Sequence, residues 1–142
     1  MAKHLKKIDA KGRVFIPAKL RDGLGGNVVV APSIDANFLT VYTPKRFYHV
    51  RDQFSQMNSM DVNLRRLYRR LIGESLPCEL DSQGRIAVSA ELWDRIEALP
   101  GDELCILDYG DKLDICKNSY YTAEDSFDMT SVDWSQYSVT GL

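Results

Sequence analysis

Hydrophobic and polar positions follow a pattern that occurs twice along the chain. Residues 9–21 read DAKGRVFIPAKLR and residues 81–93 read DSQGRIAVSAELW, so the second copy begins 72 positions after the first. Asp, Gly, Arg, Ala and Leu are identical in the two copies, and a β-branched apolar residue follows the arginine in both, Val14 and Ile86. Such a repeat predicts two similar structural units, each covering the apolar face of the other.

Each copy predicts a strand, a tight turn and a second strand. An Asp at the first turn position accepts hydrogen bonds from the backbone two residues on. A Gly three positions later supplies the positive φ at which the chain enters the next strand. The turn-orienting residues are therefore Asp9, Gly12, Asp81 and Gly84. Two interpretations of the aspartates stay open: each carboxylate only caps its turn, or it also orients the following arginine through a charge-assisted bond.

The remaining elements follow from periodicity and capping signals. Period-two alternation and short apolar runs predict strands at 1–8, 13–16, 28–31, 38–42, 76–80, 85–88, 103–109 and 112–116. Helical spacing predicts helices at 18–24, from Pro44 onward, and at 62–72, 90–98 and 119–125. Pro17 or Ser89 opens the short helix after each copy, and the expected N-caps of the other helices are Thr43, Asp61 and Asn118.

The helix expected at 62–72 carries an arginine cluster. Its apolar residues share one face, namely Leu64, Leu67, Tyr68, Leu71 and Ile72. Much of the opposite side is taken by Arg65, Arg66, Arg69 and Arg70. These arginines either grip phosphates, form a solvated face, or pair with carboxylates of a neighbouring subunit, since charge alone does not select the partner.

Charge is divided unevenly between the two halves. The net charge is −2, but residues 1–75 hold 14 Lys/Arg and 6 Asp/Glu, whereas residues 76–142 hold 4 Lys/Arg and 14 Asp/Glu. A basic half favours a polyanionic partner. The alternative is contact between subunits, basic half against acidic half, and a ring or head-to-tail assembly allows both.

Composition excludes several classes of protein. The 142 residues contain no apolar run long enough for a membrane span and none in residues 1–15 that suits a signal peptide. The three cysteines show neither a disulfide framework nor zinc spacing, so buried free thiols in a reducing cytoplasm are expected. Only His4 and His49 are histidines, and no catalytic or phosphate-loop motif is present. We therefore expect no cofactor, no metal and no enzymatic activity, although spacing does not test a pair such as Cys78 with His49.

The repeated motif resembles a known family. D-x-x-G-R followed by an apolar triplet and P-A-x-L is similar to the SpoVT/AbrB-type swapped-hairpin DNA-binding domain. Two copies, joined by a helix reading LRRLYRRLIGES, resemble the MraZ transcriptional regulator family from about Lys6 to about Ala123. The resemblance implies an α+β fold, in which two pseudo-symmetric AbrB-like repeats form one swapped-hairpin β-barrel with peripheral helices.

The resemblance also implies a function. It implies a cytoplasmic, nucleoid-associated repressor of the division and cell-wall gene cluster that begins with its own gene. Such a protein binds promoter direct repeats in double-stranded DNA as a ring-like homo-oligomer. The family's DNA-contacting positions map onto the two turns, with Arg13 and Arg85 foremost among Lys7, Lys11, Arg13, Gln83 and Arg85. The second copy departs from the pattern, because Gln83 stands where the first has Lys11 and Ser89 where it has Pro17, which makes the second hairpin less basic.

The expected organisation has four parts. Residues 1–58 form the first repeat with its following helix, 59–75 the arginine-rich connecting helix, 76–125 the second repeat, and 126–142 a flexible acidic tail. An alternative function is a protein-interaction module of antitoxin type that uses its basic half to hold an acidic partner. Binding that prefers a promoter fragment to random DNA separates the two functions.

Overall fold

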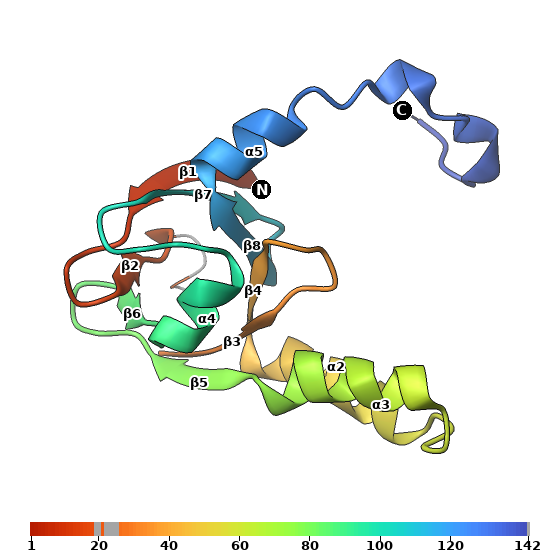
Figure 1. The fold of residues 1–142 in the computed structure, drawn as a ribbon, viewed down its shortest axis with the longest axis horizontal. Coiled ribbons are helices and arrows are strands. Elements are labelled where there is room, and N and C mark those ends of the chain that lie inside the picture. Colours follow the sequence, from red (N-terminus) through yellow and green to blue (C-terminus); the bar gives the residue numbers. More distant parts are fainter. Residues whose placement is uncertain (19–20, 22–25, 142) are drawn as a thin grey trace.

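The protein is described by a computed structural model that covers residues 1–18, 21 and 26–141. The helix predicted at 18–24 lies for the most part outside these described residues. Figure 1 shows a β-structure with its short strands at one end, a helical pair at the other and the C-terminal segment extending from one edge. In the described ranges, no helix combines the length and the apolar character that crossing a membrane requires.

Six strands form an antiparallel sheet in the order β1-β7-β8-β4-β3-β5. Their bounds are β1 Ala2–Lys7, β3 Asn27–Pro32, β4 Leu39–Tyr42, β5 Leu76–Glu79, β7 Glu103–Asp108 and β8 Lys112–Lys117. The order is symmetric about the β4–β8 pair, because each strand of the first repeat mirrors its counterpart in the second. The 72-residue repeat therefore appears in space as a pseudo-two-fold axis.

The two repeats exchange their first strands. β1 pairs with β7 of the second repeat, and β5 pairs with β3 of the first. Hydrogen bonds extend both exchanges into the turns: the Ile8 N–H donates to the Asp102 carbonyl at 3.0 Å, and the Leu80 N–H donates to the Gly26 carbonyl at 2.9 Å. This exchange confirms the predicted swapped-hairpin fold of the α+β class.

A two-stranded ribbon continues from the two edge strands. It consists of β2 (Arg13–Phe15) and β6 (Arg85–Ala87), which pair antiparallel. Val14 lies directly opposite Ile86, its own counterpart in the repeat, so the pseudo-two-fold axis passes through this pair. The six-stranded sheet stays open between β1 and β5, so the barrel is not closed by one continuous ladder within the described residues.

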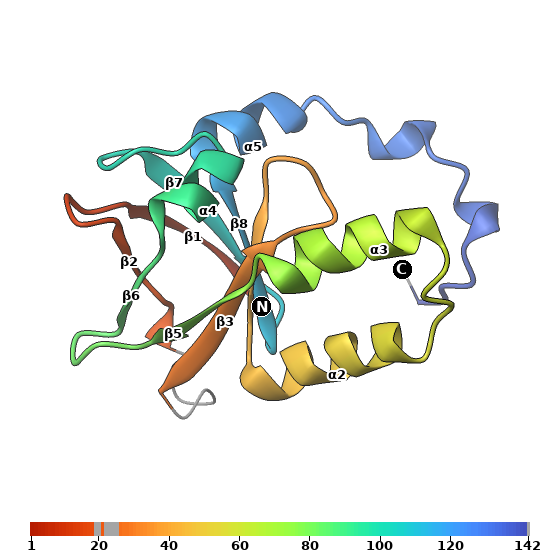
Figure 2. The same cartoon turned by 60° about the horizontal axis from the view of Figure 1, so that its bottom comes forward.

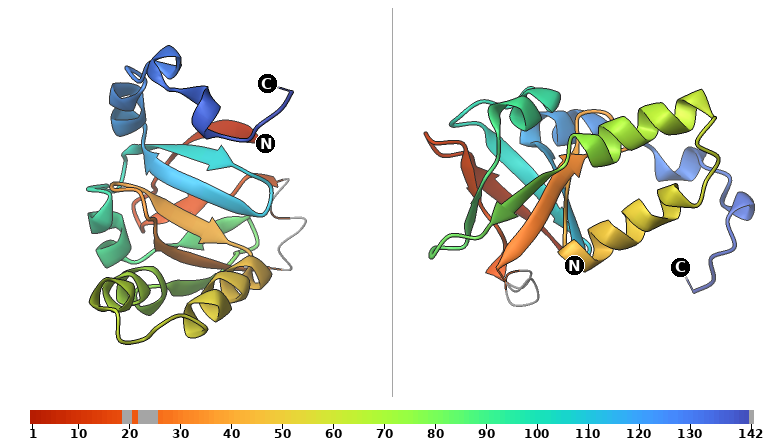
Figure 3. Two further views of the ribbon diagram at one scale, coloured as in Figure 1. Left: turned by 90° about the vertical axis from the view of Figure 1, so that its right-hand side faces the viewer. Right: turned by 90° about the horizontal axis from the view of Figure 1, so that it is seen from below.

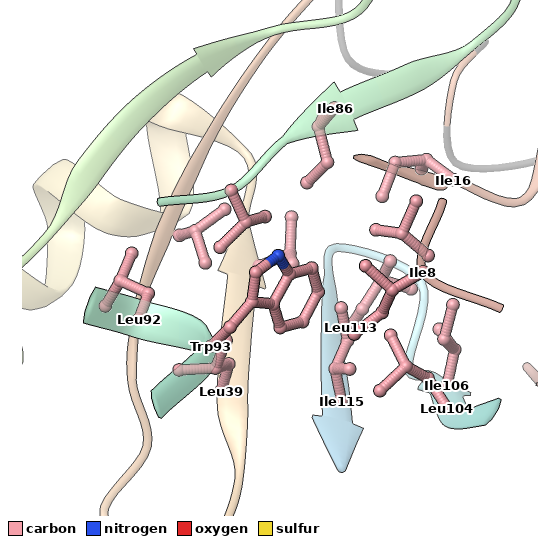
Figure 4. Packing of buried hydrophobic residues seen from close by; sticks show 14 of the residues in the cluster. Ile8, Ile16, Leu39, Ile86, Leu92, Trp93, Leu104, Ile106, Leu113 and Ile115 are labelled. Carbon is pink, nitrogen blue, oxygen red and sulfur yellow. The ribbon is translucent and has the colours of Figure 1, made fainter. Parts of the chain in front are cut away.

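The hydrophobic core fills the space between the sheet and the ribbon. Ile8, Val14 and Ile86 pack in one cluster with inward residues of the sheet such as Leu113. Figure 4 shows the Trp93 side chain at the centre of this cluster. The core residues of β4, β7 and β8 alternate along the strand, as the period-two pattern predicts, whereas β1 has no buried residue.

The helices lie outside the sheet. Their bounds are α2 Pro44–Ser55, α3 Val62–Tyr68, α4 Ala90–Arg95 and α5 Asn118–Glu124, with a π turn η1 at Arg69–Gly73 and 3-10 turns η2 at Met129–Ser131 and η3 at Trp134–Gln136. α2 and α3 run side by side at the end of the molecule opposite the two hairpin turns (Figure 2). α4 lies beside the ribbon, and α5 lies across β7 and β8.

Capping was predicted correctly for three helices and wrongly for one. The side chains of Thr43, Asp61 and Ser89 accept hydrogen bonds from the third residue after each, as expected of N-caps. The N-cap of α5 is Lys117 rather than Asn118. Asn118 is the first residue of α5, and its side-chain amide donates to the Glu103 carboxylate of β7 at 3.0 Å instead of capping the helix.

The helix predicted at 62–72 differs from the prediction in two ways. Its regular part ends at Tyr68, and the remaining residues form the wider π turn, for which the sequence carries no signal. The apolar face is only partly covered: Leu64 is half-buried, whereas Leu67 and Tyr68 are exposed. Among the described helices α2 meets this face through the Phe54–Tyr68 contact, and apolar surface remains uncovered.

The cysteines are buried free thiols, as predicted. Burial raises the pKa of Cys78 to about 11 and that of Cys116 to about 12. Cys105 and Cys116 are cross-strand partners on β7 and β8, and burial raises the pKa of Cys105 as well. All three thiols are therefore kept protonated at neutral pH, which disfavours nucleophilic or metal-binding roles.

Candidate nucleic-acid interface

The two hairpin turns project from the same end of the molecule. The first links β1 to β2 and the second links β5 to β6, and both stand out beside α4 in Figures 2 and 3. Gly12 has φ of 77° and Gly84 has φ of 80°, the positive values predicted for these positions. In each turn the Gly N–H donates to the carbonyl of the Asp three residues earlier, Asp9 or Asp81.

Asp9 organises the first turn with both carboxylate oxygens. Its Oδ1 accepts from the backbone N–H groups of Lys11 at 2.9 Å and Arg13 at 2.8 Å. Its Oδ2 accepts from the Arg13 Nε at 2.7 Å. The backbone N–H of Arg13 is the largest cause that lowers the pKa of Asp9, and the guanidinium lowers it further. The carboxylate thus caps the turn and holds the arginine at once.

Asp81 repeats this arrangement in the second turn. Oδ1 accepts from the backbone N–H groups of Gln83 and Arg85, both at 2.9 Å, and Oδ2 accepts from the Arg85 Nε at 2.8 Å. The pKa of Asp81 is lowered, first by the backbone N–H of Arg85. Because the geometry is the same in both turns, the D-x-x-G-R motif itself, and not the surrounding residues, determines the backbone cap and the Asp–Arg bond.

The outer face of the ribbon brings the two arginines together. Arg85 lies opposite Phe15 in the register, and its guanidinium carbon is 5.8 Å from the Phe15 ring centroid. Arg85 Nη1 also lies 3.8 Å from Oδ2 of Asp9, so the two turns share one charge network. Both arginine side chains are partly buried, at 29% and 19% exposed for Arg13 and Arg85. Each arginine is bound to its own aspartate through Nε. The Nη groups of Arg13 form no hydrogen bond with any described residue.

Each turn is covered by a residue from the other repeat. Trp93 packs on Gly12, and its Nε1 donates to the Gly12 carbonyl at 2.9 Å. Arg21 packs on Gly84, where an added Cβ would overlap its guanidinium, and its Nη1 reaches the Gln83 carbonyl at 3.5 Å. Trp93 and Arg21 occupy equivalent positions of the repeat, 72 residues apart. Their role was missed because the exchange of strands, which the alignment of the copies does not show, places each against the opposite turn.

The other predicted contact residues lie in or beside the turns. Lys11 and Gln83 are exposed at equivalent positions, and Lys7 is exposed at the end of β1. The edge strand β1 also exposes Lys3 and Lys6. The first turn is therefore the more basic of the two, although Arg21 brings a guanidinium to the second.

The arginine helix does not belong to this surface. Arg65, Arg66, Arg69 and Arg70 lie on α3 and η1, at the opposite end from the two turns (Figure 3). The Arg65 Nη1 donates to the Ser59 carbonyl at 3.0 Å, and Arg70 pairs with Glu74 at 3.1 Å. The cluster therefore lies apart from the ribbon and its two turns within one chain.

Comparison with known proteins identifies the family. Residues 1–70 match the family model of the MraZ protein, described as antitoxin-like. Transcriptional regulator MraZ of Alkaliphilus oremlandii is 33% identical over 126 residues, which cover 89% of this chain and 86% of that protein. The chain belongs to the MraZ family. Transcriptional regulator MraZ of Nitrosococcus oceani is 34% identical, over 76% of this chain and 74% of that protein. That of Shewanella frigidimarina is 36% identical, over 60% of this chain and 59% of that protein.

MraZ family membership confirms the relationship predicted from the repeated motif. The relatives are named transcriptional regulators, so this chain is a transcriptional regulator and not an enzyme. Among the residues that the structure describes, no group of three or more His, Cys, Asp or Glu side chains is arranged to hold a metal ion. The charged groups that the ribbon and its turns present are the Asp–Arg pairs together with the exposed Lys7 and Lys11.

Proposed function

We propose that this MraZ family member is a sequence-specific repressor that reads DNA with its β2–β6 ribbon and the two flanking turns. The observation that carries the proposal is the pair of Asp–Arg clamps, Asp9–Arg13 and Asp81–Arg85, side by side on one face. Each clamp holds an arginine by Nε, and the Nη groups of both arginines form no hydrogen bond with a described residue. A two-stranded ribbon fits the major groove of DNA, and arginine reads guanine there by paired hydrogen bonds.

The aspartates serve this role through preorganisation. A free carboxylate facing phosphate would repel DNA, but here each carboxylate is paired with its arginine and accepts two backbone hydrogen bonds. An arginine held in place also loses less conformational entropy on binding. Lys7 and Lys11 then supply phosphate contacts beside the first turn, and Gln83 supplies an uncharged donor and acceptor beside the second.

One ribbon is too small to supply specific affinity alone. Specific binding is commonly about 10⁻⁸ M or tighter, against roughly 10⁻⁴–10⁻⁶ M for non-specific contact. Several ribbons on repeated sites close that gap through effective concentration. We therefore propose that the chain acts as a ring-like homo-oligomer on direct repeats. Following the resemblance to the family, the repeats lie in the promoter of the division and cell-wall gene cluster that begins with its own gene, and binding occurs in the cytoplasm at the nucleoid.

The test is a titration of wild type and Arg13→Ala against promoter DNA from upstream of the gene, with a scrambled duplex alongside, at two salt concentrations. Wild type is expected to prefer the promoter. Arg13→Ala is expected to lose about tenfold or more in affinity, because each arginine–base contact contributes about 1–3 kcal/mol. Each lost phosphate contact lowers the log–log salt slope by about 0.9.

Arg51→Ala is the matched control. Arg51 is an exposed arginine that pairs with Asp52 at 3.1 Å, but it lies on α2, at the other end of the molecule. The Arg51→Ala substitution removes the same charge as Arg13→Ala and should leave promoter affinity unchanged. Circular dichroism checks that both variants fold. Equal losses in Arg13→Ala and Arg51→Ala would mean that only net charge matters and would contradict reading by the ribbon.

The antitoxin-type interaction module stays a second candidate, because the description of the matching family model contains the word antitoxin-like. It is distinguished by the same titration. A wild-type protein that shows no preference for the promoter over the scrambled duplex contradicts the repressor proposal. The basic half is then better explained by an acidic protein partner.

A further inference from the structure

The end of the molecule opposite the ribbon carries an apolar groove. It lies between α2 and α3, has a volume of about 320 Å³ and is lined by Phe54, Ser55, Met57, Ser59, Leu64, Arg65, Tyr68 and Arg69. Two of the lining residues, Phe54 and Tyr68, meet edge to face with their ring centroids 5.8 Å apart. Met57 and Leu67 are about half exposed. The groove is thus an apolar surface to which no other described element contributes a lining residue.

Cationic residues surround the groove. Residues 44–73 contain seven Lys or Arg and two Asp. Arg65 and Arg69 belong to the lining itself, and Arg66 and Arg69 form no ion pair with any described residue. The occupant that this surface favours therefore combines apolar side chains with negative charge.

The C-terminal segment has the complementary character. Residues 124–141 contain four Asp or Glu and no Lys or Arg. Their large apolar side chains are about half exposed or more, namely Phe127, Met129, Trp134, Tyr137 and Val139. The segment therefore leaves apolar surface uncovered in a single chain. Figure 2 shows it running past the free ends of α2 and α3, and none of its residues lines the groove.

The segment is locally ordered rather than irregular. Asp128 accepts from the Thr130 N–H at 2.9 Å and hydroxyl at 2.7 Å, which caps η2. Five residues on, Asp133 accepts from the Ser135 N–H at 3.0 Å and hydroxyl at 2.6 Å, which caps η3. A small motif, DMTSV and then DWSQY, thus occurs twice in succession.

The 3-10 turn η3 presents an aromatic pair. Trp134 and Tyr137 lie edge to face at 6.4 Å, and the Trp134 Nε1 donates to the Met129 carbonyl at 3.2 Å. Because the pair is already ordered, little conformational entropy is lost when it docks. Exposed, preorganised Trp and Tyr side chains are typical anchors of protein interfaces.

We propose that residues 124–141 of one copy dock into the α2–α3 groove of a neighbouring copy, with Trp134 and Tyr137 as anchors and Arg65 and Arg69 facing the acidic residues. The contact joins two different surfaces, so it is heterologous and generates a ring where the rotation closes. The inference rests on the proposed oligomeric function, for which it names the contact, and it assigns the arginine cluster to subunit contact rather than to DNA.

The test measures the mass of full-length chains in solution by light scattering. Wild type is expected to be larger than the 16.1 kDa chain. The tail variant Trp134→Ala/Tyr137→Ala and the groove variant Arg65→Glu/Arg69→Glu are each expected to fall to the monomer mass. Both variants change exposed side chains outside the core, and circular dichroism checks that each folds. Arg46→Glu, paired with Asp111 at the base of α2, is the matched charge-reversal control and should assemble.

Mixing the two variants separates docking between copies from other causes. The intact tail of the groove variant still fits the intact groove of the tail variant, so a complex of twice the chain mass is expected. A monomeric wild type, continued assembly of either variant, or a mixture that stays monomeric would each overturn the inference.

The docking proposal and the DNA-binding proposal can be tested separately. Arg13→Ala should bind DNA poorly yet assemble normally. The tail variant should lose the tight binding to repeated sites, while it keeps wild-type affinity for a duplex that carries a single repeat. Assembly defects without any change at either DNA would therefore contradict the role of assembly in repression and leave the docking contact intact.

Discussion

At the scale of single residues, the hairpin aspartates have two structural roles in one side chain. One oxygen of Asp9 caps the turn, and the other holds the guanidinium of Arg13. Asp81 does the same for Arg85. Of the two interpretations left open by the sequence, the geometry matches the second, because each carboxylate caps its turn with one oxygen and holds its arginine with the other.

The lowered pKa values of Asp9 and Asp81 predict a pH dependence of stability. A carboxyl whose pKa is lower in the folded than in the unfolded state stabilises the fold above its ordinary pKa, here 3.8, and this contribution is lost as the pH falls through the lowered folded value. The melting temperature of wild type should therefore fall more steeply in acid than that of the double variant Asp9→Asn/Asp81→Asn. Thermal unfolding monitored by circular dichroism at a series of pH values measures this. Asp35→Asn, an exposed carboxylate in a loop, is the control and should retain the wild-type slope.

At the scale of elements, α4 shows how a short helix is stabilised at its ends and along one face. It has six residues, too few for intrinsic stability. Ser89 caps its first turn, and Leu92 and Trp93 are its buried residues. Trp93 then reaches the first hairpin turn, so the position of α4 also affects the candidate DNA surface.

Ser89→Ala is expected to destabilise the protein by about 1 kcal/mol, because the Leu92 N–H loses its capping acceptor. Urea unfolding monitored by circular dichroism measures this as a lower midpoint with an unchanged slope. Ser82→Ala, an exposed serine in the second turn, is the matched control. If the two variants unfolded at the same urea concentration, the cap would contribute nothing to α4.

At the scale of the whole molecule, the exchange of strands makes the two repeats one folding unit. The first repeat supplies β1 to β7, and the second supplies β5 to β3. Val14 and Ile86, both fully buried, meet across the ribbon. Either half alone would therefore expose the edge of its sheet and half of the core.

A fragment of residues 1–75 is accordingly expected to remain unfolded, since β1 has no partner strand without β7. Its proton NMR spectrum should show little chemical-shift dispersion. Addition of a fragment of residues 76–142 should restore the dispersion as the strands exchange. A well-dispersed spectrum from residues 1–75 alone would show that the repeats fold independently.

The sequence by itself determined the local structure of this protein. The turns and the caps at Thr43, Asp61 and Ser89 were predicted because their hydrogen bonds connect residues within four positions of one another. The strands were predicted because their apolar residues alternate or form short runs. The motif at residues 9–21 and 81–93 was also sufficient to predict the family. The DNA-contacting roles of Arg13 and Arg85 remain a prediction.

The tertiary structure alone decided how the two copies are combined. Both repeats offer the same alternation of apolar and polar residues, so the pattern of β1 suits a partner strand from either copy, and only packing of the complete core selects β7. That choice places Trp93 and Arg21 on opposite turns and sends the arginines of α3 to the far end of the molecule. These placements depend on contacts between residues more than sixty positions apart, such as Trp93 with Gly12, which local preference does not specify.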